Sequence, residues 1–367
     1  MENARLDLLT SISGEKIDSV ALWEKYRREE IMVLLENFIY GVRPAGRPDD
    51  LSFEVRSNIE NFQGLPILRR DIDIRFGGYT LPFCLFLPQQ SYHKKPVPLF
   101  LHILNEHHLQ LEDPCNHPVN DFLPIDAITA RGYAVAVLST LDVSPDWTHH
   151  SEYKKGVFYA LQPDTSKRNS RSWATISAWA YGASRVMDYL ETDRDVEHTK
   201  VAVIGHSRAG KTALWAGATD PRFACVISNC SGCAGAAYTR GKQGEHIRDI
   251  NISDWFCKNY HQYDDYEEML PCDQHMLLAA IAPRPLYVKS NIEDLWAGPD
   301  EELKSCRLAS AVYELYGLPG LVLKEPLKID VSYADGTIAY HRASGDHDLK
   351  STDWKLYMDF TDRFLKD

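Results

Sequence analysis

The most informative stretch of the chain is residues 200–217, which read KVAVIGHSRAGKTALWAG. It opens with an apolar run that is typical of a strand buried on both faces. The turn GHSRAG (205–210) follows, and residues with a helical pattern begin at once. A buried strand, a sharp turn that contains a serine and an immediate helix together predict that the serine hydroxyl is exposed at the end of a sheet.

This arrangement is the nucleophile elbow of the α/β-hydrolase fold. Gly205 and Ala209 are small enough to avoid clashes around Ser207, although Ala209 replaces the second glycine of the usual pattern. The N–H after the serine would point to a developing oxyanion, aided by the helix N-terminus. An ordinary turn in which Ser207 only caps the helix is the alternative. We predict that Ser207 is a nucleophile.

Two cations, Arg208 and Lys211, stand in the first turn of the predicted helix. Cations at this end oppose the helix dipole, so local helix stability does not explain them. They indicate an anion, a developing oxyanion or sugar hydroxyls in the site. Salt bridges to surface acids are the alternative interpretation.

Short apolar runs alternate with helical segments along much of the chain, which predicts a mainly parallel sheet with helices on both faces. The expected strands are 67–76, 79–87, 97–104, 133–139, 200–204, 224–228, 285–290 and 337–342. The expected helices are 21–41, 171–191, 208–218, 273–281 and 300–316. Segments near 105–130, 140–170 and 229–272 do not fit the alternation, and we expect these insertions to form a cleft. We therefore predict one α/β-hydrolase domain over residues 1–367, with a catalytic core over 67–365.

In this fold the catalytic residues follow the chain order serine, acid, histidine. His347 lies in the loop SGDHD (344–348) after the last expected strand, where the general base belongs. Asp294 follows the preceding strand and is the expected acid, which would fix the imidazole tautomer; Glu293 is the alternative. Solvated loop positions would explain the same residues without catalysis.

The composition fits a globular protein, with 44% hydrophobic and 25% charged residues. The formal net charge of −12 argues against nucleic acid or an anionic membrane as a partner. The apolar runs are too short to cross a bilayer, and residues 1–16 do not resemble a secretion signal. We expect a cytoplasmic protein, or a secreted or periplasmic one if a signal was removed. The eight cysteines are expected to be mostly free thiols.

Thiol or metal chemistry is a weaker hypothesis. Cys230 and Cys233 have C-x-x-C spacing, and His107, Cys115 and His117 are potential zinc ligands. Redox C-x-x-C pairs normally begin a helix, whereas this pair lies in a loop rich in glycine and alanine, and the histidines lack a standard spacing. A catalytically inactive α/β-hydrolase that serves as a binding module is a further alternative.

Several longer stretches resemble the glucuronoyl esterases, carbohydrate esterase family 15. They are SWATISAWAYGASRVMDYLETDRDVEHTKVAVIGHSRAGKTALWAGATDPRFA (172–224), SGCAGAAYTRGKQGE (231–245), LPCDQHMLLAAIAPRPLYV (270–288), DLWAGP (294–299) and GDHDL (345–349). The resemblance implies a serine esterase that cleaves esters of (4-O-methyl-)glucuronic acid on xylan. It also implies that Arg208 stabilises the oxyanion. The residues that it assigns to the sugar are Lys211, Glu245 and Trp296.

The chain departs from the family pattern at Cys230, where many members carry the triad glutamate. A thiol cannot stabilise an imidazolium as a carboxylate does, so Asp294 is expected to be the sole triad acid. The expected partner is a carbohydrate ester bound by a monomer, without a cofactor or metal. An esterase for acetyl groups on xylan, with the same triad, is the alternative; it would not need cations around the acyl side.

Overall fold

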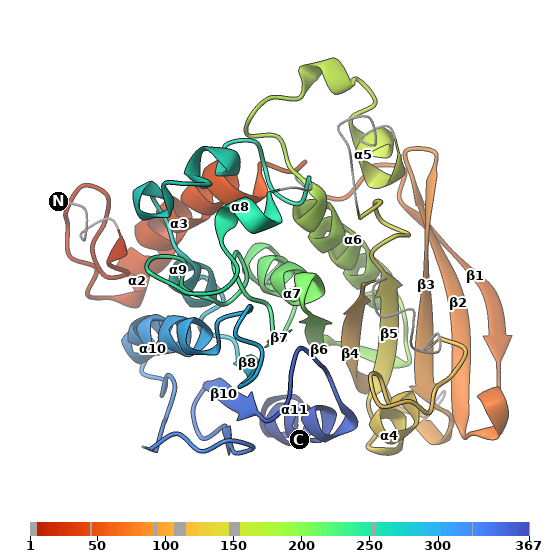
Figure 1. Ribbon diagram of the computed structural model, residues 1–367. Helices are drawn as coiled ribbons and strands as arrows, with labels where there is room; N and C mark the ends of the chain where they lie inside the picture. Colours follow the sequence, from red (N-terminus) through yellow and green to blue (C-terminus); the bar gives the residue numbers. More distant parts are fainter. Residues whose placement is uncertain are drawn as a thin grey trace.

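The computed structural model describes residues 6–44, 46–91, 94–105, 115–146, 155–251, 254–324 and 326–366. In these ranges ten strands form one sheet with the order β1-β2-β3-β5-β4-β6-β7-β8-β10-β9 (Figure 1). The strands are β1 (Ser52–Ile59), β2 (Ile67–Phe76), β3 (Tyr79–Pro88), β4 (Val97–Leu104), β5 (Ala134–Ser139), β6 (Val196–His206), β7 (Cys225–Asn229), β8 (Leu286–Asn291), β9 (Ser332–Tyr333) and β10 (Ile338–Ala343).

The strands from β5 through β4, β6, β7 and β8 to β10 pair in parallel, whereas β1, β2, β3 and β9 join by antiparallel pairing. The helices are α2 (Val20–Leu22), α3 (Arg28–Leu35), α4 (Ile125–Ala130), α5 (Gly156–Leu161), α6 (Thr175–Leu190), α7 (Arg208–Thr219), α8 (Ile247–Ile250), α9 (Gln274–Ala279), α10 (Pro299–Leu315) and α11 (Ser351–Leu365). Parallel strands place their carboxyl ends along one edge, where the loops that follow can meet.

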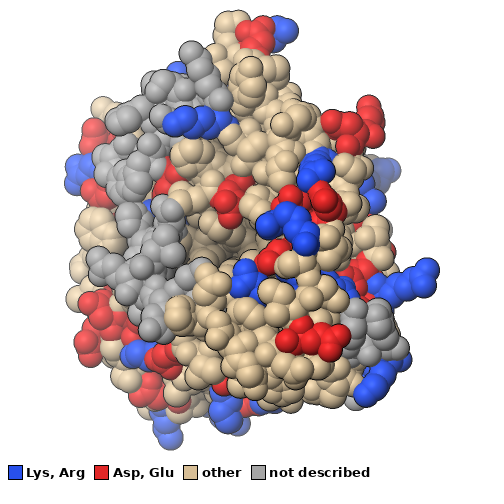
Figure 2. All heavy atoms as spheres, turned by 90° about the vertical axis from the view of Figure 1, so that its right-hand side faces the viewer, with Lys and Arg blue, Asp and Glu red and all other residues tan. Residues whose placement is uncertain are grey.

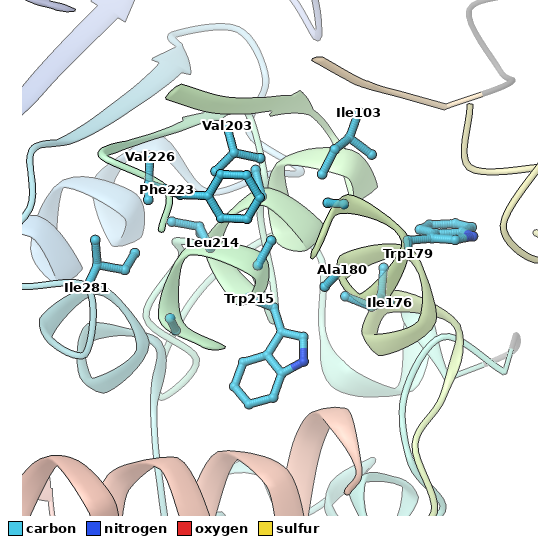
Figure 3. Packing of buried hydrophobic residues seen from close by; sticks show 14 of the residues in the cluster. Ile103, Ile176, Trp179, Ala180, Val203, Leu214, Trp215, Phe223, Val226 and Ile281 are labelled. Carbon is cyan, nitrogen blue, oxygen red and sulfur yellow. The ribbon is translucent and has the colours of Figure 1, made fainter. Parts of the chain in front are cut away.

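Two hydrophobic clusters cover opposite faces of the sheet. Val201 and Val203 of β6 belong to the cluster with α3, α6, α7, α9 and α10, whereas Ala202 and Ile204 belong to the cluster with α4 and α11. This alternation is the period of two expected of a strand covered on both faces. Figure 3 shows part of the first cluster between α6 and α7, including Trp215. The helices lie on both faces, as the sequence predicts.

Most expected elements are present with boundaries shifted by a few residues, but four predictions need correction. β6 begins four residues earlier than expected. The expected helix 21–41 is helical throughout residues 20–40 and ends at Gly41, but it is not purely α-helical, because π-helical turns at Trp23–Arg27 and Glu36–Tyr40 flank α3. The sequence reading missed α11, β1 and β9. Finally, the expected insertions are not wholly irregular, since they contain α4, α5 and α8.

Charged side chains are interspersed rather than segregated on the face drawn in Figure 2, where acidic and basic groups surround a central hollow. The net charge of −12 therefore does not collect there as one acidic patch. Among the described helices, none has both the length and the apolar character that crossing a membrane requires. All eight cysteines are free thiols, as expected.

Candidate active site

Ser207 stands at the junction of β6 and α7 with φ 59° and ψ −128°. A positive φ is uncommon for a residue with a side chain and marks a constrained turn. The Ser207 N–H donates to the carbonyl oxygen of Asn229 at 2.8 Å, which ties the turn to the end of β7. A Cβ on Gly205 would lie 2.1 Å from the carbonyl oxygen of Ala209, so this position requires glycine. The sharp turn predicted from the sequence is present.

Ser207 lines a cavity of about 440 Å³ at the carboxyl edge of the parallel strands. The cavity brings together all seven residues predicted for the site: Ser207, Arg208, Lys211, Glu245, Asp294, Trp296 and His347. Of these seven, Glu245 comes from the insertion 229–272, which also contributes other lining residues such as Cys230 and Trp255, so this insertion forms part of the cavity wall as expected. Residues distant in the sequence therefore share one small volume.

His347 and Asp294 are in direct contact. The imidazole Nδ1 lies 2.6 Å from Asp294 Oδ2. Asp294 is only 4% exposed, and its other carboxylate oxygen accepts the N–H of Ala297 at 3.1 Å. A carboxylate fixed from both sides can hold the imidazole in one orientation. Glu293, the alternative acid, is exposed and does not line the cavity.

The loop that carries His347 is anchored through its neighbour Asp348. The buried Lys289 donates to the Asp348 carbonyl oxygen at 2.9 Å, and the Asn229 side chain donates to the same oxygen at 2.8 Å. Asn291 donates to the Asp348 carboxylate at 2.8 Å. These donors stand at the ends of β7 and β8. The two strands therefore fix the position of the histidine loop.

Arg208 is held on one side by a carboxylate and on another by an aromatic ring. Its Nη1 donates to Asp146, which also accepts the indole N–H of Trp255 at 2.7 Å. The guanidinium lies 4.7 Å from the centre of the Trp255 ring. The Arg208 Nε–H is buried and has no hydrogen-bond partner among the described residues. Arg208 thus does form a salt bridge, but with a buried acid, and it retains one donor.

Lys211 is bound by three acceptors. Its ammonium donates to the carbonyl oxygens of Ser231 and Cys233 at 2.8 and 2.6 Å, and to Glu245 at 3.0 Å. Glu245 also accepts the N–H of Cys233 at 3.0 Å. The pair therefore shapes the loop after β7. Trp296, with 56% of its surface exposed, contributes an aromatic surface to the cavity.

The side chain of Glu302, at the start of α10, binds the backbone of the same loop. Its carboxylate is fully buried and accepts the N–H groups of Ser231 and Gly232 at 2.8 and 2.9 Å. Its second oxygen accepts the hydroxyl of Ser290 at 2.5 Å. Burial raises the pKa of Glu302 above its ordinary value. The cavity wall thus rests on a carboxylate that is harder to ionise than an exposed one.

Comparison with known proteins identifies the family. Residues 117–317 match the family described as "Glucuronyl esterase, fungi". A curated relative from an unidentified prokaryote, Carbohydrate esterase MZ0003, is 37% identical, and the match covers 98% of this chain and 89% of the relative. The chain belongs to the glucuronoyl esterase family.

Two further similarities support membership of the glucuronoyl esterase family. The 4-O-methyl-glucuronoyl methylesterase of Schizophyllum commune is 34% identical over 85% of this chain and 74% of its own length. The structure of the glucuronoyl esterase from Solibacter usitatus has a TM-score of 0.88 and 33% identity, with 97% of this chain and 96% of that chain covered. The expected α/β-hydrolase fold and the expected family are both confirmed.

Cys230, the position at which the chain departs from many glucuronoyl esterases, lies beside the histidine. Its sulfur and the potential ligand atoms of Asp294 and His347 all lie within 4.8 Å of one another. The thiol donates to the side-chain oxygen of Asn291 at 3.2 Å. Burial raises the pKa of the Cys230 thiol well above its ordinary value. A neutral thiol therefore stands next to Asp294 and contributes no second negative charge.

The described residues of the thiol and metal hypothesis, Cys115, His117, Cys230 and Cys233, do not assemble into a second centre. Cys230 and Cys233 are both free thiols, and of the two only Cys230 lines the cavity. His107 lies outside the described residues. Cys115 and His117 belong to no group of three potential metal ligands among the residues that the structure describes.

Sequence reasoning missed four residues that support this glucuronoyl esterase site: Asp146, Trp255, Lys289 and Glu302. Lys289 carried a signal, because it is a cation within the expected strand PLYVKS (285–290), directly after four apolar residues. Glu302 could be seen as an acid in the first turn of a helix, but nothing in the sequence shows that it turns inward. Asp146 and Trp255 lie in insertions without periodicity, so no pattern indicates them.

Proposed function

We propose that this chain hydrolyses esters of (4-O-methyl-)glucuronic acid, either on glucuronoxylan or on uronate oligosaccharides derived from it. The reaction proceeds through an acyl-enzyme on Ser207, with His347 as general base and Asp294 as triad acid. The observation that carries the proposal is the 2.6 Å contact between His347 and Asp294 in the cavity that Ser207 lines. The family relationship supplies the substrate class.

The first step uses the neutral imidazole of His347 as a proton acceptor. The Ser207 oxygen attacks the ester carbon as its proton passes to Nε2, because Nδ1 is occupied by Asp294. Collapse of the tetrahedral intermediate breaks the bond to the alcohol, which takes the proton from the imidazolium. A water molecule then attacks the acyl-enzyme by the same route, and the uronic acid leaves.

Arg208 is suited to the charge that develops on the carbonyl oxygen. Its guanidinium is fixed by Asp146 and Trp255, and the buried Nε–H has no acceptor in the described part of the chain. A donor that is already oriented stabilises an oxyanion more than the neutral ester, and this difference raises the rate. We assign Arg208 to the oxyanion.

The cavity wall supplies contacts for the sugar. Lys211 and Glu245 form a charged pair that can bind hydroxyl groups, and Trp296 presents an exposed ring to a sugar face. We assign these three residues to the uronate. An acetyl ester has no acyl-side sugar that could use them.

Turnover of benzyl glucuronate and of an aryl acetate tests this proposal. We expect kcat/KM to be at least about a hundredfold higher for the glucuronate ester, because the sugar contacts are lost with acetate. Ser207→Ala should abolish turnover of both. Equal or higher kcat/KM on the acetate would favour the carbohydrate acetyl esterase instead, and unchanged activity of Ser207→Ala would refute the mechanism.

A further inference from the structure

A second cavity, of about 800 Å³, lies at the far end of α7 from Ser207. Helix α7 begins beside the active site at Arg208 and ends at Thr219, which lines this second cavity. Its 12 residues span roughly 18 Å at 1.5 Å per residue, so the two cavities are separate. Parts of α3 and α6 form the other walls.

The second cavity has an excess of positive charge. Six arginines line it, against four acidic residues. The arginines are Arg28, Arg43, Arg47, Arg185, Arg222 and Arg284. The chain as a whole carries a net charge of −12, so this local balance is opposite to that of the protein. We call this site the arginine cavity.

Three of the arginines are neutralised by carboxylates. Arg47, Arg185 and Arg222 all form ion pairs with Asp188, at 2.9, 2.5 and 2.6 Å. Arg222 also pairs with Asp220 at 2.7 Å. These contacts join α6 to the segment after α7. A structural role therefore explains the presence of these three arginines.

Arg28 and Arg284 have different partners. Arg28 donates to the carbonyl oxygens of Ala280 and Ala218 at 3.1 and 2.9 Å. Arg284 donates to those of Gly217, Asp220 and Phe223 at 2.6, 3.1 and 3.0 Å. Backbone carbonyls fix the two guanidinium groups without cancelling their charge. A positive field therefore remains in the cavity.

Arg43 is the exception within the cluster. No hydrogen bond or ion pair joins it to another of the described residues, and its Nη1 is buried without a hydrogen-bond partner there. Burial lowers the pKa of Arg43 to about 10, even though Asp220 acts to raise it. A buried donor that lacks an acceptor is unfavourable, and a charged one more so. An oxyanion in the cavity would satisfy this group.

We propose that the arginine cavity binds a small molecule that carries a carboxylate or a phosphate group, with Arg43 as its main ligand. The planar guanidinium matches both oxyanions through paired N–H donors. Arg28 and Arg284 add a favourable field from fixed positions. Glu191 lies outside the cavity lining but pairs with Arg47 and Arg222, so one positive charge remains in excess and suits a ligand with a single anionic group. This inference does not depend on the proposed esterase activity.

Calorimetric titration of the full chain with inorganic phosphate, citrate or free glucuronate tests the site. At least one probe should bind saturably at one site per chain, and Arg43→Gln should weaken its binding at least tenfold. Arg75→Gln, which removes an exposed arginine of β2 that pairs with Glu54, should change the affinity less than twofold. The esterase activity of both variants should equal that of the wild type. Preference for glucuronate or citrate over phosphate would assign a carboxylate ligand, and the reverse a phosphate ligand.

Absence of saturable binding for all three probes would overturn the proposal, as would equal affinity in Arg43→Gln and the wild type. Either result would mean that Arg43 is satisfied within the protein, with Asp220 and Glu36 of the same cavity as the candidates. If Arg43→Gln does not fold, Thr219→Glu places a carboxylate in the cavity wall instead. It should also abolish binding, and undiminished binding would contradict the site.

Discussion

Two partly buried arginines, one near each end of α7, differ in what holds them. Arg208 begins the helix and is fixed by Asp146 and by the face of Trp255, and one buried N–H has no hydrogen-bond partner within the described ranges. Arg43 lies at the other end, and its Nη1 has no hydrogen-bond partner among the residues that the structure describes. The guanidinium of Arg208 is therefore held in one orientation, whereas the charge of Arg43 has no direct ion pair among the described residues.

The difference separates two uses of the same side chain. A donor that is fixed before the reaction loses little free energy when charge appears, which favours a transition state. A guanidinium without partners gains most from a ligand that arrives already charged. The comparison therefore predicts that mutations near Arg208 change kcat, whereas mutations near Arg43 change ligand affinity alone. Four predictions concern the Arg208 end of α7 and the active site around it, from the largest expected effect to the smallest.

The largest effect is expected from Asp294→Asn. The amide cannot stabilise the imidazolium and favours the wrong tautomer of His347, so kcat on benzyl glucuronate should fall about 10³- to 10⁴-fold. Glu293→Gln is the matched control, because Glu293 is exposed outside the cavity, and it should retain activity. Strong residual activity in Asp294→Asn, or a loss of activity in Glu293→Gln, would mean that Asp294 is not the triad acid.

Release of Arg208 from its carboxylate should have the next largest effect. In Asp146→Asn the guanidinium loses its ion pair and part of its orientation, and kcat should fall about 10- to 100-fold. KM should change much less, because the interaction strengthens only in the transition state. Arg43→Gln is the control at the other end of α7 and should leave kcat unchanged. An equal loss in both variants would remove the distinction between the two arginines.

Cys230→Glu should have a small effect on the wild-type background, within about tenfold, because Asp294 already serves His347. In Asp294→Asn the same substitution should restore part of the lost activity, since a carboxylate at residue 230 would lie close to the imidazole. Cys230→Ser is the control and should restore nothing. Steady-state kinetics of the four combinations measure this coupling, and independent effects of the two substitutions would contradict it.

Glu302→Gln should change stability more than turnover. In the folded protein the pKa of Glu302 is raised above its ordinary value of 4.5, because the side chain is buried. The contribution of this group to the free energy of unfolding is therefore fully present below pH 4.5 and is lost as pH rises through the folded pKa. Urea unfolding between pH 4 and pH 8 should show a smaller loss of stability with rising pH in Glu302→Gln than in the wild type. Glu301→Gln, at the neighbouring position, is the control. Identical pH dependence in Glu302→Gln and the wild type would refute the assignment.

The parts of the fold that could be predicted are those in which sequence and structure are coupled locally. The elbow at Ser207 requires a buried strand, small neighbours and an immediate helix, and all are contiguous in the chain. His347 and Asp294 could be placed because each follows a recognisable strand. Strand ends at one edge of a parallel sheet converge by topology, without detailed knowledge of side chains.

The missed elements divide into two kinds. Helix α11 had a usable signal, since its buried residues Trp354, Tyr357, Met358, Thr361 and Leu365 follow helical spacing. In contrast, β1 has only partly exposed or exposed residues, so its pattern of burial gives no contrast between faces. Its place in the sheet comes from pairing with β2, which depends on the rest of the fold.

Asp146 and Trp255 could not be predicted from the sequence for a different reason. Asp146 meets Trp255 across 109 residues of chain and Arg208 across 62, so their contribution depends on long-range contacts. Neither lies in a periodic segment, and an isolated aspartate or tryptophan in an insertion has many possible environments. Only the three-dimensional arrangement shows that the two hold one guanidinium.

Labelling with a fluorophosphonate, followed by peptide mass spectrometry, tests most directly whether the side chains around Ser207 form a working nucleophile. The account predicts one adduct per chain, on Ser207, with no adduct in Ser207→Ala and much slower labelling in Asp294→Asn and His347→Gln. An adduct on another residue, or labelling of Ser207 at the same rate in all these backgrounds, would contradict it.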